Sequence, residues 1–415
     1  MMSSIKLYIG ALLVLLSTSA QAQTPVLSLD TVLNRISQNN GMLQEIEFRA
    51  KAQNAMAKGA RSQMAPMVGA GVFMYPYPGQ MKMEEDDAMY MTAVEQDITN
   101  PAKLKAREKY QLSRAAIEEA GRDMTFNQLR AQAKTAYYQW VVLEKKKAVL
   151  AESQRIMQFM LKLGKVRYPY NQSSLGSIYK AEGRVGEVEN MLTMTNSEIE
   201  MKNIQLNMLM NLPPENRFKV DTTVQAPVLI VLPDTASLSA ARSDVRQIDR
   251  TIESMQLNLR LENIQRKPDF GIRFENMMPR DRMMPQSFTL MGMVSIPIAP
   301  WSSKMYKANA TAMNLEIQGM RKGREALVNE AQNMVASMAL ELQAKRTQVQ
   351  NYEKKIIPAL RRNYETTLLS YEQNTGQLPL VIDAWEALNM AQMEYLNNLE
   401  QLYLIGVNYE KELEK

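Results

Sequence analysis

The sequence predicts a mainly α-helical chain with a small β part, built from a duplicated helix–strand–strand–long helix unit. The first observation is internal repetition at an offset of about 200 residues. The second is that each copy places two short alternating apolar runs before a helical stretch of roughly seventy residues. A repeated unit that joins short strands to so long a helix is unlike an ordinary globular domain. We therefore expect the strands to complete one structure and the long helices another.

Matched positions support the duplication along the whole chain. Arg242–Val245 takes the place of Asn40–Leu43, and Pro66 and Pro268 each open a strand-like run. Later matches are Val94 and Ile98 with Val294 and Ile298, and Tyr168, Leu175 and Ala181 with Tyr371, Leu378 and Ala384. The offset drifts only where loops would change length. The expected repeats are residues 23–238 and 239–415.

The N-terminus has the pattern of an export signal. Lys6 precedes the apolar run 7–16, and Ala20-Gln21-Ala22 is a typical cleavage site. We expect residues 1–22 to be a signal peptide and the mature chain to begin at Gln23. No later run reaches eighteen apolar residues, so the sequence predicts no transmembrane helix.

The composition argues against most catalytic chemistry. Cysteine and histidine are absent, and they supply the commonest nucleophiles, bases and zinc ligands. No nucleotide-binding loop or hydrolase motif occurs. The net charge of +5 is scattered, without a basic stripe interleaved with aromatic residues. We predict no enzyme, no cofactor and no nucleic-acid partner.

The first repeat is expected to contain helices 30–63, 101–168 and 175–211, and strands 65–75 and 89–98. Asp30 is the expected N-cap of the first helix, and Asn100-Pro101 opens the second in the favoured way. A seam with four–three spacing predicts coiled-coil packing within the second helix. Its members are Leu129, Ala133, Ala136, Trp140, Leu143, Lys147 and Leu150.

The second repeat is expected to contain helices 239–265, 301–371 and 379–413, and strands 268–277 and 288–298. Pro358 should kink the long helix. Breaks at Tyr168-Pro169 and Asn374-Thr375-Gly376 end the long helices of the two repeats.

The strands alternate between two kinds of face. In 288–298 one face holds only apolar residues and glycine, whereas the other mixes threonine, serine and methionine. Such alternation is typical of a barrel wall with lipid outside and a wetter lumen inside. Tyr75, Tyr77, Tyr90 and Trp301 lie near strand ends, where aromatic girdles belong. Four strands in one chain would leave open edges, and closing a barrel from several chains removes them.

The chain resembles the TolC family of outer-membrane efflux proteins, in its heavy-metal, RND-type branch. The likeness rests on the duplicated element order and three motifs that cover nearly all of 28–413. They are Gln96–Arg107 after the second strand, Val294–Trp301 after the fourth, and Tyr371–Ala384, which is similar to the family's helical tip. Each motif is loose alone, whereas their order and duplication are specific.

The resemblance implies a homotrimer whose chains each give four strands to one outer-membrane β-barrel, continued by an α-helical coiled-coil tunnel in the periplasm. It implies as partners outer-membrane lipid, a periplasmic adaptor (membrane fusion) protein and an inner-membrane RND-type pump. The tip residues that would contact the adaptor are Ser173, Ser174, Leu175, Gly376, Gln377 and Leu378. The first tip lacks the family's glycine. Asp383 lies near the family's acidic gate position, and a solvated helix residue is the alternative there.

Methionine gathers around the strands. Thirteen of the 33 methionines fall within 64–98 and 277–293. Thioethers bind soft cations such as Cu(I) and Ag(I), and the acidic run 84–87 could attract cations. The residues expected to contact metal are Met81, Met83, Met91, Met283, Met284, Met291 and Met293. The alternative is that these methionines fill apolar surface.

The sequence thus predicts a passive exit duct of a tripartite efflux system, exporting copper, silver or other heavy-metal ions. A drug-efflux or type I secretion duct of the same fold is the near alternative. A secreted coiled-coil or metal-buffering protein without a pore is the alternative from another class.

Overall fold

The computed structural model describes residues 25–75, 77, 79, 88–224, 232–280, 284–297 and 299–414. The expected signal peptide and Met81, Met83 and Met283 lie outside these residues. The chain divides into two compact units. The sheet unit comprises Met42–Thr125 and Pro233–Gln332, and the hairpin unit comprises Met1–Gly41, Phe126–Leu232 and Asn333–Lys415.

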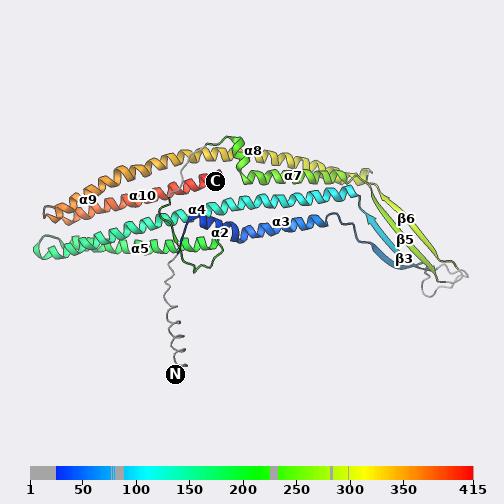
Figure 1. Cartoon of the computed structure of the whole chain (residues 1–415), viewed down its shortest axis with the longest axis horizontal. Helices are drawn as coiled ribbons and strands as arrows, with labels where there is room; N and C mark the ends of the chain where they lie inside the picture. The colour runs from blue at the N-terminus through cyan, green and yellow to red at the C-terminus, as the bar shows by residue number, and fades with distance from the viewer. Residues whose placement is uncertain are drawn as a thin grey trace, which may run out of the picture. The chain divides into compact units, whose positions relative to one another are not determined.

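The sheet unit contains a four-stranded antiparallel sheet (Figure 1). Its strands are β2 (Met67–Phe73), β3 (Met89–Ile98), β5 (Asp269–Pro279) and β6 (Ser287–Ser295), in the order β2-β3-β5-β6. The central pair β3–β5 joins one repeat to the other, with Ile98 opposite Phe270 and Met89 opposite Pro279. The helices α3 (Gly41–Gly59), α6 (Thr235–Ala241) and α7 (Ser243–Ile264) complete this unit together with the first parts of two longer helices.

The register places all four helix–strand junctions at the same end of the sheet, here called the junction end. Met67 lies opposite Glu95, Ile98 opposite Phe270, and Asp269 opposite Ser295. The strand ends Phe73, Met89, Pro279 and Ser287 therefore lie at the opposite end of the sheet, here called the loop end. At the junction end, the buried Lys103 ammonium lies 2.6 Å from an Asp269 carboxylate oxygen. This ion pair connects the two repeats.

Two long helices run through both units. They are α4 (Pro101–Arg167) and α8 (Pro300–Asn351), and Asn100 caps α4 by accepting a 3.0 Å hydrogen bond from the Ala102 N–H. In the hairpin unit α4 is followed by the short turn Tyr168–Tyr170 and α5 (Leu175–Leu209). The chain returns through α9 (Ile357–Glu372) and α10 (Leu378–Glu412). A two-residue parallel pair, β1 (Val26–Leu27) with β4 (Lys219–Val220), was not predicted.

The predicted seam of α4 lies in the core of the hairpin unit. Leu129, Ala133, Ala136, Trp140, Leu143 and Leu150 are all at most 5% exposed, whereas Lys147 is exposed. Small alanines within the seam let neighbouring helices approach closely. A second apolar cluster near the ends of α4 and α9 joins four helices, including Met160 of α4, Ala181 of α5, Tyr371 of α9 and Ile382 of α10.

Each repeat begins with two helices where one was expected. The predicted helix 30–63 is interrupted at Asn40, and the predicted helix 239–265 is interrupted at Arg242. Both residues have extended backbone with closely similar angles, and each donates its N–H to a carbonyl four residues earlier. The Asn40 side chain also donates to the Leu209 carbonyl, at 2.8 Å. The first N-cap is Ser28 and not Asp30, since Ser28 Oγ accepts from the Thr31 N–H.

Pro358 acts through a change of helix type just before it. Residues Tyr352–Ile356 form a π-helical turn between α8 and α9. The Ile357 N–H then bonds to the Tyr352 carbonyl, five residues back. Proline has no N–H and its ring crowds the preceding turn, so the wider turn accommodates it without ending the helix.

No helix in the described part of the chain is both long enough and apolar enough to cross a membrane.

Candidate functional sites in the sheet and at the helical tip

The two faces of the sheet differ in chemistry, as the alternation predicted. Residues paired across antiparallel strands share a face. One face, here called the apolar face, carries exposed hydrophobic side chains from every strand. They are Val68, Val72, Tyr90, Val94, Phe270, Ile272, Phe274, Met278, Phe288, Leu290 and Val294. Phe274 and Phe288 stack at 5.9 Å between ring centroids. An exposed apolar patch this extensive marks an interaction surface.

The opposite face, here called the polar face, carries the charged residues. The Arg273 Nε lies 2.9 Å from a Glu275 carboxylate oxygen and 3.6 Å from one of Glu95. Asp97 lies opposite Gly271, where an added Cβ would be 3.4 Å from the Asp97 oxygen and 3.1 Å from the Met293 methyl. The glycine thus leaves room for both side chains on a crowded face.

The polar face carries Met67 and Met89 as well as two groups of methionines that are candidate metal contacts. Met91 lies directly opposite Met277, near the loop end of the sheet. The sequence argument did not single out Met277. Met291 lies opposite Arg273 and Met293 lies opposite Gly271, and both are nearer the junction end of the sheet. Met284 is half-buried in the link between β5 and β6. The shared face is as expected, but within one chain these side chains do not converge on one point.

Acidic clusters do not compete with the methionines as metal ligands in the described part of the chain. No group of three or more Asp or Glu residues there is arranged to hold a metal ion.

At the tip, the two hairpin turns are built differently. Ser174 caps α5, its Oγ accepting from the Ser177 N–H at 3.2 Å, whereas Gln377 at the start of α10 makes no side-chain cap. Ser173 Oγ is buried and has no hydrogen-bond partner among the residues that the structure describes. The Gly376 N–H donates to the Ser370 carbonyl at 3.0 Å, and an added Cβ would meet the Tyr371 nitrogen at 3.2 Å. Gly376 is thus held tightly against the end of α9.

The two tip leucines have different surroundings. Leu175 is 44% exposed, whereas Leu378 is 2% exposed. Leu378 packs against α4 at Gly164, where an added Cβ would lie 3.0 Å from the leucine methyl. Of the two, only Leu175 therefore offers surface to another chain, and any part of Leu378 in a partner contact would be indirect.

Arg167 holds the two hairpins together at the tip. Its guanidinium donates to the carbonyls of Tyr371 at 2.5 Å and Glu372 at 3.0 Å, and stacks on the Tyr371 ring at 4.5 Å. The last carbonyls of a helix lack partners within the helix. Arg167 donates to the Glu372 carbonyl, and it shares the Tyr371 carbonyl with the Asn374 N–H, which lies 3.1 Å from it. Nothing near Arg167 in the sequence signals this role, because its partners lie 204 and 205 positions away.

Asp383 belongs to an ion-pair network between α5 and α10. Lys180 Nζ lies 2.6 Å from the Asp383 carboxylate and 3.9 Å from Glu386. Arg184 donates to Glu386 at 2.7 Å and to Glu187. The hydrogen bond to Glu187 raises the pKa of Arg184, burial opposes this, and the bond to Glu386 adds to it. The sequence argument identified Asp383 but neither of the two cations.

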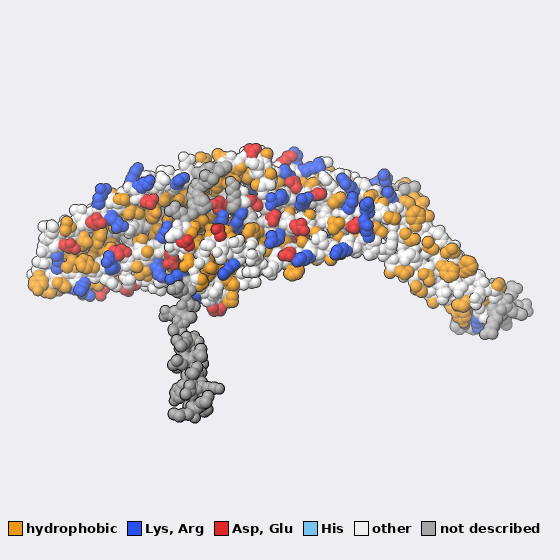
Figure 2. All heavy atoms as spheres, viewed as in Figure 1, with side chains coloured by type: hydrophobic (Ala, Val, Ile, Leu, Met, Phe, Trp, Pro, Cys, Tyr) orange, Lys and Arg blue, Asp and Glu red, His pale blue; other side chains and the backbone are white. Residues whose placement is uncertain are grey.

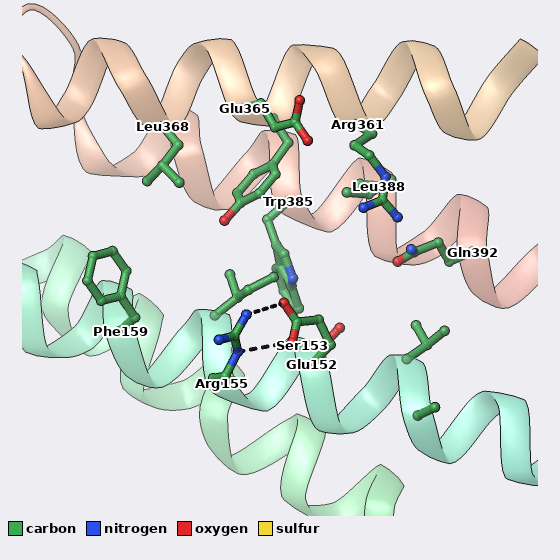
Figure 3. A pocket seen from close by; sticks show the side chains of 14 residues that line it. Glu152, Ser153, Arg155, Phe159, Arg361, Glu365, Leu368, Trp385, Leu388 and Gln392 are labelled. Carbon is green, nitrogen blue, oxygen red and sulfur yellow. Dashed lines mark hydrogen bonds and ion pairs between the residues drawn. The ribbon is translucent and has the colours of Figure 1, made fainter.

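A cavity of about 650 Å³ lies between α4, α9 and α10 (Figure 3). Trp385 and Phe159 line it, and Arg155 donates two hydrogen bonds to Glu152 at its rim, at 3.0 and 2.7 Å. Burial raises the pKa of Tyr364 on the α9 wall. This mixture of aromatic surface with one ion pair suits packing against another helix as well as it suits a small molecule.

Comparison with solved structures identifies the fold. The chain is similar to the outer-membrane channel OprN, with 14% identity and a TM-score of 0.75 over 93% of this chain and 89% of that one. It is similar to CusC, described as forming a transmembrane channel, with 13% identity and a TM-score of 0.75 over 96% and 95%. It is also similar to the outer-membrane protein VceC of Vibrio cholerae, with 15% identity and a TM-score of 0.71 over 93% of this chain and 95% of that one.

No protein-family model and no curated protein sequence matches the chain. At these identities the likeness rests on the arrangement of the backbone over nearly the whole chain. It agrees with the resemblance carried by the duplicated element order and the tip motif: the chain has the fold of the TolC-family outer-membrane channels.

Proposed function

We propose that this chain is the outer-membrane exit duct of a tripartite efflux system, a passive channel without catalytic activity. The single observation that carries the proposal is the four-stranded sheet with one exposed apolar face, set within the fold of outer-membrane channels. A lipid-facing surface needs such a face, and a water-filled lumen needs the charged one behind it.

In the proposed assembly three chains close one barrel. Within the described residues, the outer edges of β2 and β6 pair with no other strand. Unpaired strand edges in lipid would leave backbone groups without hydrogen bonds, and closure removes this cost. Joining β6 of one chain to β2 of the next would turn every apolar face outward and place Glu95, Arg273 and Glu275 inside.

The helices would continue the barrel as a tunnel in the periplasm. Its tip, formed by the turns at 173–175 and 376–378, would meet a periplasmic adaptor coupled to an inner-membrane RND-type pump. Ser174 and Gln377, which are exposed at the two turns, fit a contact surface for the adaptor. Asp383, with its exposed carboxylate 2.6 Å from Lys180, would act at the gate by breaking or keeping that pair.

The proposed cargo is Cu(I) or Ag(I). Met91, Met277, Met291 and Met293 share the face that would line the lumen. Conduction requires contacts weak and numerous enough to release the ion, and thioethers in successive rows along a wall fit that need. Export of drugs or of proteins by the same duct is the alternative.

Channel activity can be tested on the purified full chain. Reconstitution into planar bilayers should give stepwise conductance, and cell fractionation should place the chain with the outer membrane. A chain that stays soluble without detergent and never conducts would reject the duct in favour of a secreted rod.

The cargo needs a separate test in a strain that lacks the native gene. Complementation with Met91, Met277, Met291 and Met293 all changed to leucine should leave trimer levels unchanged, because leucine nearly conserves volume. Silver tolerance should fall while drug tolerance should not. Equal silver tolerance in both strains would leave only the general duct.

A further inference from the structure

The ends of α4 and α7 next to the sheet have a higher excess of basic residues than the rest of the same helices. Residues 101–114 contain five Lys or Arg and one Glu, and residues 257–267 contain three and one. Farther from the sheet, residues 242–253 of α7 hold three cations and three anions, and residues 115–167 of α4 hold ten cations and five anions. Figure 2 shows Lys and Arg side chains gathered over the helices beside the sheet. We call these two segments the basic collar.

Three cations of the collar surround one groove. Lys105 and Lys109 lie one turn apart on α4, and Arg260 lies on α7. The groove has a volume of about 230 Å³, and its floor is apolar, formed by Ala102, Ala106, Leu257 and Ile264. All three cations are exposed. A site with cations at its rim and hydrocarbon at its floor matches an anion attached to an apolar tail.

These three cations carry no ion pair with a described residue, and they share this with other exposed cations of the unit such as Arg114 and Lys304. What sets them apart is that they surround one groove, whereas some exposed cations elsewhere in the unit are held in ion pairs. Examples are Arg49 with Glu45, Arg250 with Glu253, and Lys322 with Glu325. Within the collar the buried Lys103 is paired with Asp269. The three groove cations are therefore free of internal carboxylate partners and accessible to an external anion.

The place of the groove in the chain fixes its depth relative to a membrane. Lys105 and Lys109 follow the start of α4 by four and eight residues, which is roughly 6 and 12 Å of helix. Arg260 precedes Pro268, where the strand region begins, by a similar length. The polar headgroup layer of a bilayer is about 5–8 Å deep on each side, and long basic side chains can reach back into it.

We propose that the groove between α4 and α7 binds the headgroup of an anionic phospholipid, with Lys105, Lys109 and Arg260 around the phosphate and the apolar floor against the glycerol and first acyl carbons. The proposal rests on the proposed function, because the apolar face of the sheet must already lie in a bilayer. It adds a lipid specificity: the duct is anchored at its periplasmic side by negatively charged lipid.

The test compares lipid binding by the full-length protein and two variants that lose the same charge. The first is Lys105→Gln, Lys109→Gln, Arg260→Gln. The control is Arg49→Gln, Arg250→Gln, Lys322→Gln, which removes exposed cations outside the collar. Each protein is placed in nanodiscs of phosphatidylcholine alone or mixed with phosphatidylglycerol. Native mass spectrometry then counts the lipids retained, and fluorescent phosphatidylglycerol gives the affinity.

Wild type and control should retain phosphatidylglycerol in preference to phosphatidylcholine, and the groove variant should bind it roughly a hundred-fold more weakly, because it loses three basic residues. The preference should weaken with added salt, as expected for exposed charges. Competition by inorganic phosphate at equal concentration would identify a site for free anions and overturn the lipid assignment. Equal retention by the groove variant and wild type would also overturn it.

Failure of this inference is distinct from failure of the proposed function. A chain that enters neither kind of nanodisc contradicts its membrane location. Entry into both without lipid preference contradicts the groove alone. Thermal unfolding in detergent checks that all three proteins are folded.

Discussion

Leu175 and Leu378 hold equivalent positions in the two repeats, yet the first is 44% exposed and the second 2%. Tyr168 and Tyr371 show the same contrast, at 45% and 1%. The second hairpin buries its pair against the first hairpin of the same chain, through Gly164 and Arg167. The equivalent surface of the first hairpin has no such neighbour among the described residues. In a ring of alternating hairpins, the second hairpin of an adjacent chain would cover it.

This asymmetry predicts different outcomes for the same substitution at the two leucines. Leu175→Asp should weaken association between chains while leaving each chain folded. Leu378→Asp should unfold the tip, because it places a charge in a site that excludes water. Crosslinking in mild detergent measures the first effect, and limited proteolysis at 373–377 measures the second.

Tyr170→Asp is the matched control for these variants. Tyr170 is 74% exposed in the hairpin turn, so the same charge there should change neither association nor proteolysis. An intact trimer in Leu175→Asp would show that another surface joins the chains.

The contacts of Arg167 predict that a single substitution there loosens the end of α9. Arg167→Gln removes the donors to the Tyr371 and Glu372 carbonyls and the cation over the ring. We expect the last turn of α9 to lose about 1–3 kcal/mol of protection against local opening. Arg167→Lys should lose nearly as much protection as Arg167→Gln, since an ammonium cannot donate to both carbonyls in the geometry of the planar guanidinium. Amide hydrogen exchange at 369–376 reports the change, and unaltered exchange in Arg167→Gln would mean that the clamp is unimportant.

Buried tyrosines predict a loss of stability at alkaline pH. Burial, and then the charge of Glu410, raise the pKa of Tyr138, which is 2% exposed and lies against Tyr403. Burial likewise raises the pKa of Tyr403. Because the pKa of Tyr138 in the folded protein lies above its unfolded value, the stability that the buried neutral phenol contributes is fully present below the ordinary pKa of 10. It is lost as the pH rises from there toward the folded pKa.

Tyr138→Phe separates this effect from general alkaline damage. The variant has no phenol to ionise at that position, so its unfolding midpoint should fall less than that of wild type above pH 10. At neutral pH the two should differ little. Parallel decline of both proteins would assign the alkaline loss to other groups.

Local signals in the sequence located most elements of the fold. Asn100-Pro101 marks the start of α4 because capping and the fixed φ of proline act within one turn. The alternation of β6 fixes its faces because the side-chain period of a strand is two. The repeat offset predicted which elements correspond, and the interruptions at Asn40 and Arg242 occupy corresponding positions.

What the sequence missed depends on partners far along the chain. The helix break at Asn40 is completed by the Leu209 carbonyl, and the Arg167 clamp by carbonyls of α9. Periodicity cannot reveal such contacts, since both residues are compatible with a continuous helix. The same holds for Leu378, where the pattern shows an apolar tip residue but not whether it is covered.

The Lys103–Asp269 pair predicts an asymmetric response at the junction of the two repeats. Lys103 has a side chain 6% exposed, and its ammonium lies 2.6 Å from Asp269, which also accepts from the Asn100 N–H at 2.9 Å. Asp269→Ala leaves a buried cation uncompensated, so we expect unfolding to become easier by about 3 kcal/mol. Lys103→Met keeps the apolar stem and removes the charge, and should cost much less. Denaturant unfolding of both variants and of the double variant in detergent measures the difference. The double variant should recover most of the stability lost in Asp269→Ala. A double variant as unstable as Asp269→Ala would mean that the carboxylate acts through Asn100 and not through Lys103.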